Sequence, residues 1–120
     1  MQAKTILFVV LVLLCGAAVY FVTQNSPGSP SAGAKVFNIR IEDKRIVEGD
    51  ALLRADEGDT VTINLTSDEA EEFHLHGYDR SVDLVPDTRE SLVFVADASG
   101  RFPFELELSK TELGAIEVSP

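Results

Sequence analysis

The stretch Gly58–Ser67, GDTVTINLTS, shows the clearest periodicity in this chain of 120 residues. Val61, Ile63 and Leu65 alternate with threonine and asparagine, so that one side of the segment is apolar and the other polar. Successive side chains of a β-strand point to opposite faces of the sheet. The alternation therefore predicts a strand that is buried on one face.

The same alternation recurs on both sides of that stretch, in VFNIRIE (36–42), GRFPFELEL (100–108) and LGAIEV (113–118). The segment SLVFVAD (91–97) is apolar in both registers, which is typical of a strand covered on both faces. Only SDEAEE (67–72) suggests a helical turn, a single acidic one whose carboxylates we expect to form a solvated face. Turn-forming residues separate the segments at even spacing. The sequence therefore predicts an all-β sandwich or barrel.

The beginning of the chain differs from this pattern. Residues 5–22, TILFVVLVLLCGAAVYFV, carry no charged side chain and are just long enough to cross a bilayer core of about 30 Å as a helix. We favour an uncleaved membrane anchor, because the apolar run continues beyond the small residues 16–18 where a signal would be cut. A removed secretory signal stays open as an alternative. A lipoprotein acylated at Cys15 is a further one, although Leu14 precedes that cysteine where a small residue is expected.

The positions of the basic residues predict the orientation of this segment. Lys4 precedes it, and no basic residue follows until Lys35. The positive-inside bias therefore places the rest of the chain outside the cytoplasm, on the periplasmic or extracellular face, or secreted if the segment is cleaved. Residues 23–34, TQNSPGSPSAGA, read as a flexible tether, and residues 35–120 as the folded domain.

Composition narrows the classes of partner. The chain has 20 acidic and 10 basic residues, a formal net charge of −10. Such a surface argues against nucleic acid and anionic lipid as partners and favours cations or a protein with a basic surface. Cys15 is the only cysteine and lies in the apolar segment, so residues 35–120 can form neither a disulfide nor a thiolate metal ligand.

The order of the features in residues 35–120 resembles the cupredoxin family. EGDTV (57–61) precedes a strand rich in threonine and asparagine, a strand with histidines follows, and G-x-F-x-F…L-G-x-I-x-V-x-P closes the chain between Gly100 and Pro120. The resemblance covers nearly all of the expected domain. It implies a cupredoxin-like Greek-key β-sandwich.

The resemblance also implies where the ligands of a blue copper centre would fall. The cysteine position corresponds to Leu106, the second histidine falls near Ser109, and the axial methionine near Glu112. None of these three residues is the expected ligand, and only the first histidine is retained. Since the thiolate gives a type 1 site its electronic character, we expect no type 1 electron transfer.

The stretch EFHLHGYD (72–79) contains both histidines of the chain. His74 and His76 are two residues apart on an expected strand, so their side chains share one face. Two imidazoles at that spacing can converge on one copper, zinc or nickel ion. The simpler interpretation is that the pair is only the exposed face of a strand. A pH-responsive pair, next to the acidic residues 69–72, is a third interpretation.

Further ligands would have to be carboxylates. Asp79 directly follows the histidine strand, and the resemblance places three glutamates in the segment that lines the metal end: Glu105, Glu107 and Glu112. We favour Glu107, which adjoins the position of the missing cysteine. The predicted ligands for copper, with zinc as the alternative, are His74, His76, Glu107 and Asp79.

The sequence shows neither a nucleophile motif nor a glycine-rich phosphate loop, so we do not expect an enzyme. The interpretation that competes with metal binding is a metal-free structural or interaction module, which would use its acidic surface to bind a protein partner. These two alternatives remain open at the level of the sequence.

Overall fold

The computed structural model describes residues 32–120. The predicted apolar segment and most of the predicted tether lie outside the described residues. Within residues 32–120 no helix is long and apolar enough to span a membrane. The strands are β1 (Ala34–Glu42), β2 (Arg45–Glu48), β3 (Leu52–Asp56), β4 (Thr60–Ser67), β5 (Glu71–Leu75), β6 (Arg80–Leu84), β7 (Glu90–Val95), β8 (Gly100–Leu106) and β9 (Thr111–Ser119).

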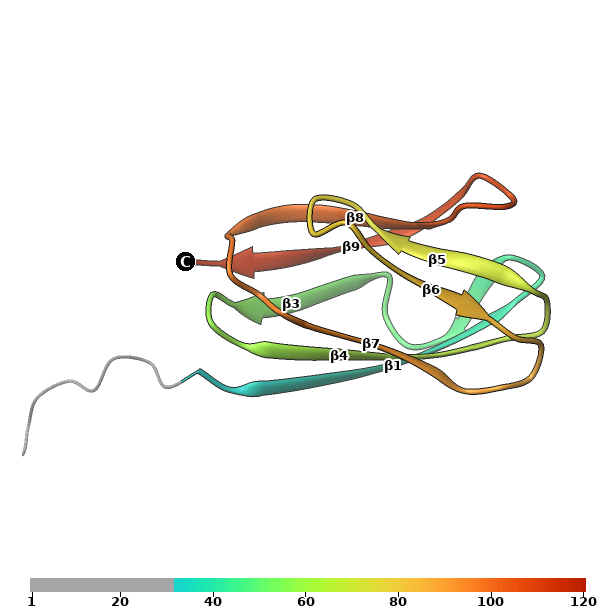
Figure 1. Cartoon of the computed structure of the whole chain (residues 1–120), viewed down its shortest axis with the longest axis horizontal. Helices are drawn as coiled ribbons and strands as arrows, with labels where there is room; N and C mark the ends of the chain where they lie inside the picture. The colour runs from blue at the N-terminus through green and yellow to red at the C-terminus, as the bar shows by residue number, and fades with distance from the viewer. Residues whose placement is uncertain (1–31) are drawn as a thin grey trace, which may run out of the picture. The chain divides into compact units, whose positions relative to one another are not determined.

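The strands form two sheets. One contains four strands in the order β2-β1-β4-β7, and the other contains five in the order β3-β9-β8-β5-β6. Strands β1 and β4 are parallel, as are β3 and β9, and the other paired strands are antiparallel. Figure 1 shows the layer of β8, β9 and β5 above the layer of β1, β4 and β7. The prediction of an all-β sandwich is confirmed for this part of the chain.

The core lies between the two sheets. Val61, Ile63 and Leu65, the apolar residues of the most regular stretch, are fully buried on β4. From the opposite sheet Phe73 and Phe104 pack against one another, with ring centroids 5.2 Å apart. Burying each such side chain stabilises the fold by about 1.5–3 kcal/mol. The period-two pattern of the sequence thus corresponds to the inner faces of the sandwich.

The first residues of the described part belong to the domain. Strand β1 begins at Ala34, and the backbone N–H of Gly33 donates a hydrogen bond of 2.8 Å to Oδ1 of Asp59. The other oxygen of Asp59 accepts a bond of 2.9 Å from the N–H of Asp56. These two donors, Asp56 first, lower the pKa of the Asp59 carboxyl. Asp59 thereby fixes the entry of the chain into β1.

The prediction that residues 91–97 are covered on both faces is wrong. Strand β7 is an edge strand of the four-stranded sheet. Leu92 and Phe94 are buried, whereas Val93 and Val95 are each 52% exposed. The strand is apolar on both sides, but only its inner face meets another layer.

The expected acidic turn at residues 67–72 is also wrong. Ser67 ends β4 and Glu71 begins β5, so that only three residues connect the strands and no helical turn forms. Glu71 shares the inner face of β5 and is 5% exposed, instead of lying on a solvated face. The alternation along the strand, and not the charge of the side chain, determines that Glu71 faces the core.

Gly114 on β9 allows a close approach between chain segments. A Cβ added at this position would overlap the carbonyl oxygen of Ala51, which accepts a 2.9 Å hydrogen bond from the N–H of Ala115. The Ala51 oxygen and the Ala115 nitrogen both belong to the backbone, so neither can move aside without distorting the sheet. We expect Gly114→Ala to lower the free energy of unfolding by about 1–3 kcal/mol, as overpacking does in cores. Urea denaturation measures this change, and an unchanged midpoint would contradict the close approach.

Candidate metal centre

Strand β5 places the two histidines on the outer face of the five-stranded sheet. Phe73 and Leu75 are fully buried, and the histidine side chains alternate with them. The N–H of His76 continues the ladder beyond the strand by donating a 3.0 Å hydrogen bond to the carbonyl of Pro103. The expectation that His74 and His76 share one face is confirmed.

Strand β8 brings two glutamates to the same face by the same rule. Phe104 and Leu106 are fully buried, so that Glu105 between them and Glu107 after them point outward. Glu105 lies directly opposite His74 in the pairing of β5 with β8. The N–H of Glu107 donates a 2.8 Å hydrogen bond to the carbonyl of Glu72, which holds this residue beside β5.

The turn after β5 ends the histidine strand sharply. Gly77 has a φ of +84°, in the left-handed region, and a Cβ there would overlap the ring of Phe102. The glycine behind the histidines is therefore required by both the backbone angle and the space. It fixes the point at which the chain leaves the sheet.

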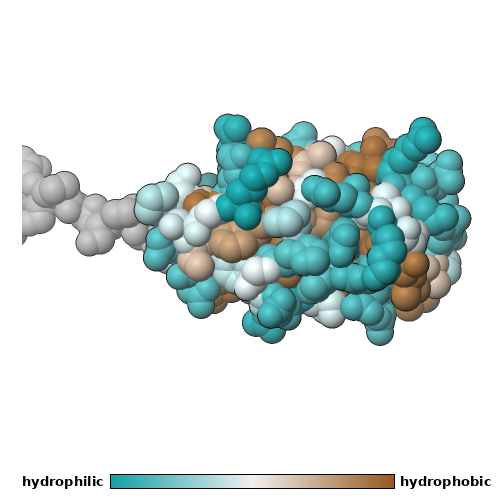
Figure 2. All heavy atoms as spheres, turned by 90° about the horizontal axis from the view of Figure 1, so that it is seen from above, coloured by the Kyte–Doolittle hydropathy of each residue, from teal (hydrophilic) through white to brown (hydrophobic). Residues whose placement is uncertain are grey.

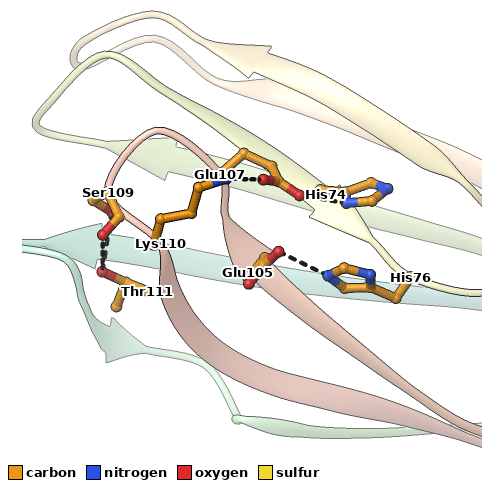
Figure 3. Close-up of polar contacts among 7 residues, drawn as sticks. All are labelled: His74, His76, Glu105, Glu107, Ser109, Lys110 and Thr111. Atoms are coloured by element: carbon orange, nitrogen blue, oxygen red, sulfur yellow. Dashed lines mark hydrogen bonds and ion pairs between the residues drawn. The ribbon is translucent and has the colours of Figure 1, made fainter.

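The four outward side chains meet in one cluster, which Figure 3 shows beside the β8–β9 hairpin. Nδ1 of His74 lies 2.8 Å from Oε1 of Glu107, and Nε2 of His76 lies 2.8 Å from Oε1 of Glu105. The two imidazole rings are neighbours, with centroids 4.4 Å apart. One donor atom from each of the four residues lies within 4.8 Å of the others.

These distances are close to those of a metal site. Ligand atoms bound at about 2.0–2.1 Å in a tetrahedron lie roughly 3.4 Å from one another. Donor atoms within 4.8 Å therefore need only small side-chain movements to reach a common ion. All four side chains are partly exposed, so an ion has access from solvent.

The two His–Glu hydrogen bonds also determine which protons an incoming ion would displace. An ionised carboxylate only accepts hydrogen bonds, so the imidazole N–H donates in both His–Glu pairs. His74 thus carries its proton on Nδ1 and His76 on Nε2. For these nitrogens to bind an ion, their protons must leave. Otherwise each ring must turn so that its other nitrogen, which carries a lone pair, binds the ion.

Lys110 adds a cation to the cluster. Its Nζ donates a 2.9 Å hydrogen bond to Oε2 of Glu107. Lys110 first, and His74 second, lower the pKa of the Glu107 carboxyl from its usual 4.5 to about 2. In turn Glu107 raises the pKa of Lys110. Glu107 is therefore held as a carboxylate.

Asp79, the remaining predicted ligand, and Glu112, the remaining candidate, lie outside this cluster. A 3.9 Å gap separates Oδ1 of Asp79 from Nε2 of His74, and the Asp79 side chain is 91% exposed. Glu112 is paired with Glu105 across β8 and β9 and is not among the clustered residues. Glu105 is the cluster member that the predicted ligand set omitted. The alternation of Glu105 with the apolar Phe104 and Leu106 is the feature of the sequence that indicates its position on the same face as Glu107.

The outer face of the five-stranded sheet is predominantly hydrophilic, as the view from above in Figure 2 shows. Apolar residues appear on it only in separate patches. The chain carries a net charge of −10, and the cluster contributes two carboxylates to this surface. The acidic surface of the protein therefore favours cations over anions.

No protein-family model and no curated protein matches this sequence. Among solved structures, an NMR structure of a copper binding protein in the apo form is similar, with a TM-score of 0.62 and 9% identity, over 76% of this chain and 93% of that chain. A chain of a heme-copper terminal oxidase dimer, determined by cryo-EM, also has a TM-score of 0.62, with 16% identity over 99% of this chain and 100% of that chain.

A blue copper oxidase from Nitrosomonas europaea is similar over 73% of this chain and 39% of its own, with a TM-score of 0.53 and 19% identity. At such identities the likeness establishes the fold alone. The fold is cupredoxin-like, as the resemblance in the sequence implied.

The ionisation of Glu107 is directly measurable. Because its pKa of about 2 lies below the usual 4.5, its charge stabilises the fold fully above pH 4.5 and less as the pH falls toward 2. We expect the Glu107 carboxyl carbon to titrate in NMR spectra with a midpoint near 2. Lys110→Met should move that midpoint upward, since it removes the largest cause. A midpoint near 4.5 in the unmodified protein would contradict the paired geometry.

Proposed function

We propose that this chain is a membrane-tethered cupredoxin-fold protein outside the cytoplasm that binds a divalent metal ion, with copper favoured and zinc as the alternative. One observation carries the proposal, namely the convergence of four donor side chains on one sheet face: His74, His76, Glu105 and Glu107. The membrane tether rests on the apolar residues 5–22 and the location on the distribution of basic residues around them.

The donor set supports the choice of ion. Imidazole suits copper and zinc, and carboxylate oxygens favour Cu(II) or Zn(II) over Cu(I). The resemblance implies that Leu106 takes the position of the type 1 cysteine, with the second histidine near Ser109 and the methionine near Glu112. Because residues 35–120 contain no cysteine, the proposed site has no thiolate. We infer that the protein holds an ion and hands it on, without type 1 electron transfer and without turnover of a substrate.

The structural neighbours support copper as the favoured ion. One is a copper binding protein, another a blue copper oxidase, and a third belongs to a heme-copper terminal oxidase. Their similarity concerns the fold, so the argument for copper in this chain still rests on its own histidines and glutamates.

A second candidate function is a metal-free subunit or interaction module. The similarity to a chain of the heme-copper terminal oxidase favours it, because it extends over 99% of this chain and that chain is part of a larger assembly. The acidic surface would then bind a partner with a basic surface. In this role the His–Glu pairs would serve only as cross-strand contacts between β5 and β8.

Titration of the full chain in detergent with Cu(II) and with Zn(II), after chelator treatment, separates the two candidates. We expect one equivalent to bind with a Kd of about 1 μM or tighter, which corresponds to roughly 8 kcal/mol. His74→Ala and His76→Ala should each weaken binding at least tenfold, because each removes a nitrogen ligand. Glu105→Gln should weaken it as well, and Asp79→Asn only slightly, since that side chain is almost fully exposed.

Asp83→Asn is the matched control for these variants. Asp83 is an exposed carboxylate on the same sheet face, opposite Glu72, and lies outside the cluster. Its removal changes the net charge as Glu105→Gln does but takes away no ligand. Binding weaker than about 1 mM in the unmodified protein, or equal losses for Asp83→Asn and Glu105→Gln, would contradict the proposed site and favour the interaction module.

A further inference from the structure

The two glutamates of the cluster differ in their partners. Glu107 uses both oxygens, since Oε1 accepts from His74 at 2.8 Å and Oε2 accepts from Lys110 at 2.9 Å. Within residues 32–120, His76 is the only ion-pair partner of Glu105. A metal ion that binds Glu105 therefore displaces no lysine, whereas on Glu107 it must compete with one.

The β8–β9 hairpin places the backbone of this lysine near Glu107. Lys110 follows Glu107 by three residues and adopts a φ of +55°, which turns the chain back toward β9. The hydroxyls of Ser109 and Thr111, 3.0 Å apart, bridge the same turn (Figure 3). The hairpin thus keeps the backbone of Lys110 close enough for its ammonium to reach Glu107.

The same lysine can leave easily. Its side chain is 78% exposed, whereas that of Glu107 is 23% exposed. Water and salt screen an exposed lysine–glutamate pair, so the contact between Lys110 and Glu107 is weak. Lys110 can therefore swing into solvent at small cost while Glu107 stays beside His74.

We propose that Lys110 is a built-in competitor for the metal ion, which occupies Glu107 when the site holds no ion and returns to it as the ion departs. This inference rests on the proposed metal-binding function. The competition makes Glu107 the last ligand to join the ion and the first to be released.

The consequence is a site adjusted for release. A dication and an ammonium repel one another and need the same carboxylate, so the lysine weakens binding. During release, Lys110 replaces the ion as the partner of Glu107, and the carboxylate is not left unpaired. Such a substitution favours handing the ion on to another ligand over holding it permanently.

Chelator competition with Cu(II) on the full chain in detergent tests this inference. We expect Lys110→Met to tighten the Kd about two- to fivefold and to slow Cu(II) release to the chelator correspondingly. Lys35→Met is the matched control, because Lys35 is an exposed lysine on β1 in the other sheet. It removes the same charge and should leave the Kd unchanged.

A double-mutant cycle with Glu107→Gln separates contact from general charge. If Lys110 acts through Glu107, Lys110→Met should have little effect once Glu107 is glutamine. The same tightening in both backgrounds, or in Lys35→Met, would overturn the inference, as would an unmodified protein and a Lys110→Met variant that bind equally. The absence of Cu(II) binding in every variant, including Lys110→Met, would instead refute the proposed metal function itself and the inference with it.

Discussion

The register between β5 and β8 is the constraint on which the candidate site depends. In this register His74 lies opposite Glu105, while Phe73 and Phe104 meet in the core with ring centroids 5.2 Å apart. Because side chains alternate with period two, a slip by one residue would turn the histidines inward and the phenylalanines into water. The burial of two aromatic rings, worth several kcal/mol, therefore positions the polar side chains on the opposite face of the sheet.

Much of the fold was predictable because one face of each sheet is buried. Where only one face is apolar, as in Val61 to Leu65, the sequence reveals both the strand and its orientation. Where both faces are apolar, as in β7, it does not reveal whether a second layer exists, and Val93 and Val95 prove to be exposed. Glu71 is the opposite case, since its position on the inner face outweighs its charge.

The site was predictable to the extent that its geometry is local. The shared face of His74 and His76 follows from their spacing alone. The spacing does not reveal whether Asp79 or Glu105 joins the cluster, because this depends on which strand pairs with β5 and in which register. Asp79 is near in sequence but follows a turn, with a φ of +50°, and its side chain points to solvent. Glu105 is distant in sequence but directly opposite His74.

The contacts within the cluster explain how its side chains can be ordered without a metal ion and still bind one. Two carboxylates within 4.8 Å repel one another, and the hydrogen bonds that they accept from His74, His76 and Lys110 offset this repulsion. Such pairs on a solvent-accessible face contribute little to stability, whereas structural zinc sites bind with about 10–16 kcal/mol. The internal contacts are thus sufficient to order the side chains and too weak to exclude an ion. An open site with weak internal partners is suited to loading and unloading, in contrast to the closed ligand sets that hold structural metals.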